Sequence, residues 1–85
     1  AFLSDDRVVI FPNPATNEVN VQLPEGAELL GLLDVTGRMT KVRFNGENGQ
    51  LRTDVSRVPA GIYFLHVRLA DGRLSARRLM VLSII

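Results

Sequence analysis

The 85-residue chain contains no cysteine and no tryptophan, and it has a single histidine and a single tyrosine. The lack of cysteine excludes disulfide bridges, thiolate metal sites and a cysteine nucleophile. Acidic and basic residues nearly balance, and the net charge of +1 is too small to steer the chain to nucleic acid or an acidic membrane. With 46% hydrophobic residues, the composition predicts a folded domain with no nucleic-acid partner and no enzymatic activity.

Long apolar runs are absent as well. No run approaches the roughly 20 residues of a membrane helix, and the first residues lack the basic and apolar regions of a secretory signal peptide. The length suits one domain. Because the chain does not begin with methionine, we expect it to be part of a longer protein, with residues 1–6 as a linker and residues 7–85 as the domain.

What the sequence does contain is a hydrophobic pattern with a period of two, interrupted by clusters of glycine, proline and asparagine. This pattern is typical of short β-strands that bury one face. It predicts an all-β sandwich or barrel rather than an α/β sheet. The seven expected strands are 7–11, 18–23, 28–35, 38–44, 50–55, 61–69 and 73–82.

The alternation also predicts which side chains face the core. The inward set comes from the second, fourth and sixth expected strands. It consists of Val19, Val21, Leu23, Val42, Phe44, Tyr63, Leu65, Val67 and Leu69.

The turn residues predict the connections. Asp71-Gly72 indicates a type I′ hairpin, and Thr36-Gly37 indicates a less ideal hairpin between the third and fourth strands. Residues 45–49 are rich in asparagine and glycine, so we expect a mobile loop there. The two prolines around Asn13 lack backbone N–H groups, which places the first strand at a sheet edge or at a crossing between sheets.

Three groups of residues suggest chemistry, and each has a simpler interpretation. Asp54, Ser56 and His66 have the residue types of a hydrolytic triad, but Ser56 lacks the glycines of a nucleophile elbow. The oxygens of Asp5, Asp6, Asn13 and Asn17 suit calcium, but their spacing matches no calcium loop and such residues are common in turns. We therefore expect no catalytic residue, no metal site and no cofactor.

Nine of the ten basic residues are arginine, a side chain that binds phosphate or sulfate in a bidentate manner. A solvated face that blocks edge-to-edge aggregation explains them more simply. The arginines in question are Arg52, Arg57, Arg68, Arg73, Arg77 and Arg78.

Four blocks of the sequence share an order and a spacing with a known family. The first is Ile10 to Ala15 followed by Asn17-Glu18-Val19, the second is Leu33 to Arg38, the third is Val58 to Leu65, and the fourth is Gly72 with Arg78-Leu79-Met80-Val81. Together they resemble the C-terminal sorting domains of the type IX secretion system, over roughly residues 9 to 82.

The resemblance implies a seven-stranded antiparallel immunoglobulin-like β-sandwich that is not a catalyst. It implies a sorting signal that directs an upstream cargo domain from the periplasm through an outer-membrane translocon. In many such proteins a sortase-like surface protease then cleaves at or before the domain and joins the cargo to anionic lipopolysaccharide. The expected location is therefore the periplasm in transit, and then the outer membrane, the cell surface or the medium.

The family's signal is concentrated in the final strands, so the resemblance implies a set of recognition residues and a set that serves folding. The recognition set is Gly61, Tyr63, Gly72, Arg78, Leu79, Met80 and Val81. The folding set is Pro12, Asn13, Pro14, Asp34, Gly37 and Arg38. Gly37, Gly61 and Gly72 are expected where the backbone needs positive φ or close approach.

The last strand, which ends in Leu79 to Leu82, suggests an exposed edge to which a receptor adds a strand. In isolation the same edge suggests a strand-swapped homodimer. The alternative function is an immunoglobulin-like accessory or adhesion module that binds a glycan or a protein.

Overall fold

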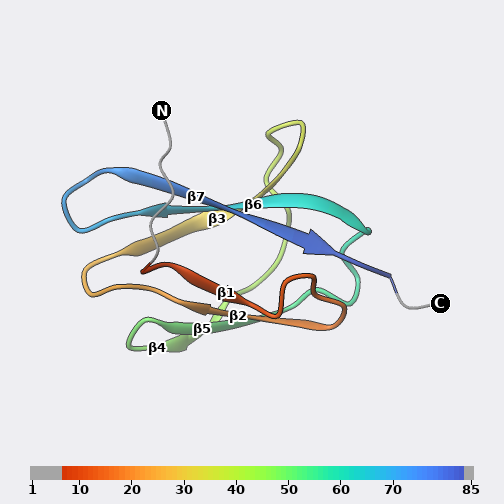
Figure 1. Ribbon diagram of the computed structural model, residues 1–85, viewed down its shortest axis with the longest axis horizontal. Helices are drawn as coiled ribbons and strands as arrows, with labels where there is room; N and C mark the ends of the chain where they lie inside the picture. The colour runs from red at the N-terminus through yellow and green to blue at the C-terminus, as the bar shows by residue number, and fades with distance from the viewer. Residues whose placement is uncertain (1–6, 84–85) are drawn as a thin grey trace.

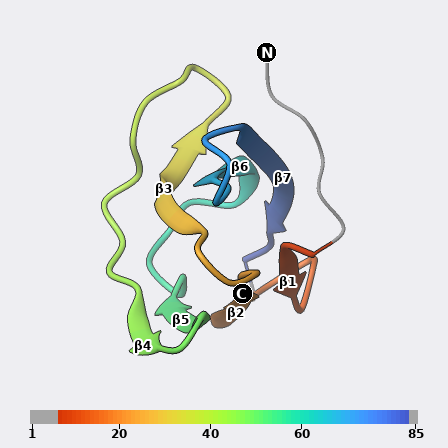
Figure 2. The same cartoon turned by 90° about the vertical axis from the view of Figure 1, so that its left-hand side faces the viewer.

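The alternating segments of the sequence form seven antiparallel strands in two sheets that face each other (Figures 1 and 2). The computed structural model describes residues 7–83, and this part of the chain contains no helix. The all-β sandwich is therefore confirmed, and the arrangement is consistent with an immunoglobulin-like fold. The strands are β1 (Val9–Phe11), β2 (Glu18–Gln22), β3 (Glu28–Asp34), β4 (Asn45–Glu47), β5 (Gln50–Asp54), β6 (Gly61–Arg68) and β7 (Leu74–Val81).

One sheet has the strand order β1-β2-β5-β4 and the other has the order β3-β6-β7. The core lies between them, because every second residue of β2, β6 and β7 points inward. The inward positions expected from β2 and β6 are confirmed, although Leu23 is only half-buried against the core. The fully buried side chains of greatest volume are Leu32, Leu65 and Leu79.

Tyr63 belongs to this core rather than to a surface. Its side chain is buried, and its hydroxyl donates a 2.6 Å hydrogen bond to the carbonyl oxygen of Pro59, four residues upstream. Immunoglobulin-like sandwiches use the same type of bond, a tyrosine corner, to fix the turn before a strand. Burial, with a smaller contribution from the nearby Asp34 charge, raises the pKa of the Tyr63 hydroxyl.

The predicted strand at residues 38–44 is wrong. In the structure, Met39 forms only an isolated bridge with Leu33, and the amide of Thr40 donates to the carbonyl oxygen of Leu32 at 2.7 Å. Residues 41–44 belong to no strand, because the chain here leaves the edge of β3 to reach the other sheet. Val42 and Phe44 still pack against the core, so the alternation predicted the side-chain positions but not the backbone pairing.

The expected loop at residues 45–49 is also wrong, since it contains β4 and the turn into β5. Asn48 and Gly49 have φ values of 56° and 76°, and Glu47 pairs with Gln50 on either side of them. Positive φ at both central residues is the requirement of a two-residue type I′ hairpin. The strongest hairpin signal of the sequence was therefore Asn48-Gly49.

The hairpin predicted at Asp71-Gly72 does form, but its turn is not type I′. Gly72 donates to the carbonyl of Leu69, and Leu69 donates to the carbonyl of Arg73, both at 2.8 Å. Only Gly72 has a positive φ, at 88°, as expected for a type I turn followed by a bulge glycine. The turn at Gly37, with a φ of 85°, has the same pattern of hydrogen bonds between Asp34 and its neighbours.

Two buried hydroxyl groups, on Thr53 and Ser75, provide a test of this core. The Thr53 hydroxyl donates to the carbonyl of Arg43 at 2.7 Å, whereas the Ser75 hydroxyl has no partner in the described part of the chain. We expect Ser75→Ala to raise the free energy of unfolding by about 1 kcal/mol, because it removes an unsatisfied buried group. For a domain of this size the melting temperature should rise by about 4–8 °C.

The matched variant Thr53→Val removes a hydroxyl that has a partner, so it should lower the free energy of unfolding by about 1 kcal/mol. Urea unfolding of both variants checks the prediction. A loss of stability in Ser75→Ala equal to that in Thr53→Val would contradict it.

Candidate functional site

Strand β7 divides the expected recognition residues between two faces. Leu79 and Val81 point into the core and are almost completely buried, whereas Arg78 and Met80 point to the outer side of the three-stranded sheet. Because adjacent residues of a strand alternate, one continuous motif cannot present all its side chains to a partner. Only Arg78 and Met80 of this block are available on the surface.

Strand β6 completes the same surface. Met80 lies directly opposite Ile62, Arg78 lies opposite Phe64, and Phe64 in turn lies opposite Leu33 of β3. The four apolar side chains are half-buried and are not among the residues packed against the core. We call this surface the outer apolar face, defined by Leu33, Ile62, Phe64, Arg78 and Met80.

Met39 extends this face at the free edge of β3. Its side chain is 54% exposed and lies over Gly31, where its sulfur occupies the space that a Cβ atom would need. In residues 7–83 the two sheets are the only layers, and no third layer covers the outer side of β3, β6 and β7 (Figure 2). The Arg78 guanidinium is exposed and makes no ion pair with any described residue.

Sequence reasoning missed Leu33, Ile62, Phe64 and Met39. The sequence contains a signal for Ile62 and Phe64. They occupy outward positions of the expected strand 61–69, where polar side chains would be usual, and the outward positions become polar only at His66. The other two depend on strand pairing and on the path of the chain after β3, which periodicity does not reveal.

The edge of β7 near Met80 is not open, so the expectation of an exposed edge at Leu79 to Leu82 is wrong. The segment between β1 and β2 lies along it, and Ala15 forms a parallel bridge with Val81. The amide of Ala15 donates to the carbonyl of Met80, and the amide of Leu82 donates to the carbonyl of Ala15, both at 2.8 Å. These backbone groups are therefore not free to accept a partner's strand.

The side chain of Asn13 continues the same pairing. Its amide nitrogen donates to the carbonyl of Arg78 at 2.8 Å, and its amide oxygen accepts from the backbone N–H of Met80 at 3.0 Å. We call residues 13–15 the strap, because they connect the edge of one sheet to the last strand of the other. Pro12 and Pro14 flank Asn13 and are exposed.

Asp34 organises the turn that carries Gly37 and Arg38. One of its carboxylate oxygens accepts hydrogen bonds from the hydroxyl of Thr36 at 2.6 Å, from the amide of Thr36 at 2.9 Å and from the amide of Arg38 at 3.0 Å. The Thr36 hydroxyl, followed by the Arg38 amide, lowers the pKa of the Asp34 carboxyl below 3.8.

The two glycines of the recognition set have structural positions. Gly72 closes the β6–β7 turn with a positive φ. Gly61 is the first residue of β6, and a Cβ atom there would make only an ordinary contact of 3.9 Å with the ring of Tyr63. No close approach occurs at Gly61, but its φ of 158° provides the positive φ that was the other expectation for this glycine.

The remaining groups do not assemble into a site. His66 lies on the outer side of the three-stranded sheet, whereas Asp54 and Ser56 follow β5 in the other sheet, where Asp54 accepts from the amide of Ser56 at 2.8 Å. Hydrogen bonds from Ser56 lower the pKa of Asp54. No three acidic or histidine side chains in residues 7–83 could hold a metal ion together.

On the surface, Arg68 forms an ion pair with Glu28 at 2.8 Å, and Arg73 forms one with Asp71 at 2.6 Å. The candidate calcium ligands Asp5 and Asp6 lie outside the described residues, as does the expected linker, residues 1–6. Over the range 7–83 the chain has no helix suited in length and hydrophobicity to crossing a membrane.

Comparison with known protein families gives a match. A family model described as a secretion system C-terminal sorting domain matches residues 9–81. The match begins at the first residue of β1 and ends at the last residue of β7, so it includes the strap and the outer apolar face. Searches of curated proteins and of solved structures found no match.

The strap generates a prediction about stability. Asn13→Ala removes one donor and one acceptor and leaves two backbone groups of β7 without partners, so we expect the free energy of unfolding to fall by about 1–3 kcal/mol. Urea unfolding measures this loss, and hydrogen exchange of the Met80 amide should become faster. Asn17→Ala is the matched control, because the Asn17 side chain makes no hydrogen bond with the described residues. Equal stability of the two variants would refute the role of the strap.

The Asp34 turn generates a prediction about pH. A carboxyl whose pKa is lowered in the folded state stabilises that state above its unfolded pKa, and this contribution disappears as the pH falls through the folded pKa. We expect Asp34→Asn to be less stable than the parent at about pH 5, with a gap that closes towards about pH 2. Chemical unfolding across this range tests it, and a gap independent of pH would contradict it. Thr36→Val should raise the Asp34 pKa, which NMR titration measures.

Proposed function

Because this chain belongs to the family of secretion system C-terminal sorting domains, it is a sorting signal for type IX secretion, and we propose that it docks on the export machinery through the outer apolar face. The family is one of signals and not of enzymes, and cleavage and surface anchoring are typical of it. The domain thus interacts with the type IX machinery on behalf of a cargo. The destination is the outer membrane, the cell surface or the medium.

The observation that carries the docking proposal is the outward position of Arg78 and Met80 beside Phe64. Aromatic, methionine and arginine side chains are enriched at the centres of protein interfaces, where they bury large areas. The apolar members of the face are not needed to fill the core. A partner that covers them would remove apolar surface from water and would surround the uncommitted Arg78 guanidinium with acceptors.

For the individual steps of export, we propose the outer-membrane translocon as the receptor of the domain and the periplasm as the compartment that it crosses. A sortase-like surface protease is the proposed processing enzyme, and its cut falls upstream of Arg7. Support for this position comes from Val8, which is completely buried, so that a cut before Arg7 leaves the whole described core with the domain. The strand-swapped homodimer remains a prediction that light scattering of the isolated domain can test.

The docking proposal predicts that export depends on the outer apolar face. The full chain is fused behind a reporter that has its own signal peptide, in a host with type IX machinery. We expect Phe64→Gln and Arg78→Glu each to reduce surface reporter by about tenfold, the effect of roughly 1.4 kcal/mol of lost binding. Fractionation and surface immunoblotting give the readout, with the missing reporter found in the periplasm.

Arg57→Glu is the matched control for charge, because Arg57 is exposed in the turn after β5, away from the outer apolar face. The purified variants should unfold at the same urea concentration as the parent, which separates docking from folding. Deletion of residues 78–85 does not make this separation, since it also removes the buried Leu79 and Val81. Normal export of both face variants would refute the docking proposal.

A further inference from the structure

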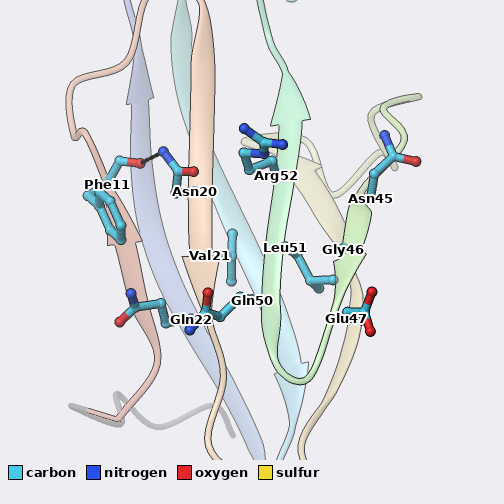
Figure 3. A pocket seen from close by; sticks show the side chains of 10 residues that line it. All are labelled: Phe11, Asn20, Val21, Gln22, Asn45, Gly46, Glu47, Gln50, Leu51 and Arg52. Atoms are coloured by element: carbon cyan, nitrogen blue, oxygen red, sulfur yellow. Dashed lines mark hydrogen bonds between the residues drawn. The ribbon is translucent and has the colours of Figure 1, made fainter.

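The outer side of the other sheet has a hollow of about 480 Å³ that no part of the sorting role uses (Figure 3). All four strands of this sheet line it, on the side away from the core. Its outward side chains include the carboxamides of Asn20, Gln22, Gln50 and Asn45. Phe11, Arg52 and Glu47 complete the lining that faces solvent.

Strand pairing arranges these side chains in two rows across the sheet. Phe11 lies opposite Asn20, Asn20 lies opposite Arg52, and Arg52 lies opposite Asn45. Two residues further along the strands, Val9, Gln22, Gln50 and Glu47 form a second row in the same way. With strands about 4.8 Å apart, each row spans about 14 Å.

Each row is apolar at its β1 end and polar elsewhere. Phe11 is 40% exposed and Val9 is 38% exposed, although both are large hydrophobic side chains. The amide groups beside them can donate and accept hydrogen bonds at once. Among the residues that the structure describes, only Asn20 uses part of this capacity, by donating to the backbone carbonyl of Phe11 at 3.3 Å.

From this arrangement we propose that the hollow binds a neutral oligosaccharide. Sugar hydroxyls both donate and accept hydrogen bonds, as carboxamides do, and the C–H face of a pyranose ring is an apolar surface that can stack on the ring of Phe11. A row of 14 Å matches a chain of about three rings, since one ring is about as long as the strand spacing. An open hollow suits a chain better than a small molecule, which needs enclosure.

The charges of the hollow indicate that the ligand is neutral. Arg52 and Glu47 contribute one charge of each sign, so the lining has no net charge to attract phosphate or a polyuronate. A peptide is disfavoured because the rows run across paired strands, whereas extended peptides bind by pairing with a free strand edge. The site lies on the opposite sheet from the outer apolar face, and its existence does not depend on the docking proposal.

NMR titration of the ¹⁵N-labelled domain tests the proposal. The probes are maltotriose, cellotriose, mannotriose and the anionic trigalacturonate, each added up to about 20 mM, well above a millimolar dissociation constant. We expect saturable shifts of the Asn20, Gln22, Gln50 and Arg52 amides with at least one neutral trisaccharide. Phe11→Ala and Arg52→Ala should each weaken its binding by about tenfold.

Phe11→Trp retains an aromatic ring and should retain binding, and Arg57→Ala is the matched control for arginine. The spectrum of each variant without sugar shows whether the fold is intact, and Phe11→Trp keeps the ring contribution testable if Phe11→Ala does not fold. No saturable shift with any neutral probe, shifts that map away from the two rows, or a preference for trigalacturonate would each overturn the proposal.

Discussion

The hydrogen bonds between the strap and β7 are the constraint on which the rest of the arrangement depends. Two backbone bonds of Ala15 and two side-chain bonds of Asn13 attach the connection between β1 and β2 to Arg78, Met80 and Leu82. The strap connects β1 and β2, which belong to the four-stranded sheet, whereas β7 belongs to the three-stranded sheet. It therefore holds the two layers together at an edge where no continuous sheet joins them.

Closure of this edge has a consequence for recognition. The backbone groups of β7 near Met80 are already paired, so a partner must use side chains instead of adding a strand there. The side chains available are those that point away from the core, Arg78 and Met80, together with their β6 neighbours. In this way a contact near the N-terminal end of the domain determines what its last strand can present.

The two outer faces of the sandwich differ in chemistry although their strands alternate in the same way. The outer apolar face on the three-stranded sheet combines apolar side chains with the Arg78 guanidinium, whereas the face of the four-stranded sheet has carboxamides beside an exposed aromatic ring. An interface with a folded protein favours the first composition. Sugar hydroxyls favour the second, because each hydroxyl needs both a donor and an acceptor.

The sequence by itself determined the all-β class, six of the seven strands to within two residues at either end, and the inward positions of β2 and β6. These follow from local rules, because alternation and turn residues act within a few positions of each other. Even Val42 and Phe44 were placed correctly inside, although no strand forms there. The type I′ turn at Asn48-Gly49 follows from the same local rules, although the type I′ turn was predicted at Asp71-Gly72 instead.

Only the tertiary structure decided which elements pair and which side chains share a surface. The strap joins residues more than 60 positions apart, and nothing in the local pattern of Asn13 indicates that it binds β7. The rows of the hollow and the outer apolar face arise from register between strands, which depends on long-range contacts. The motif from Arg78 to Val81 is continuous in the sequence. The pleat of the strand nevertheless places two of its side chains in the core and two on the surface.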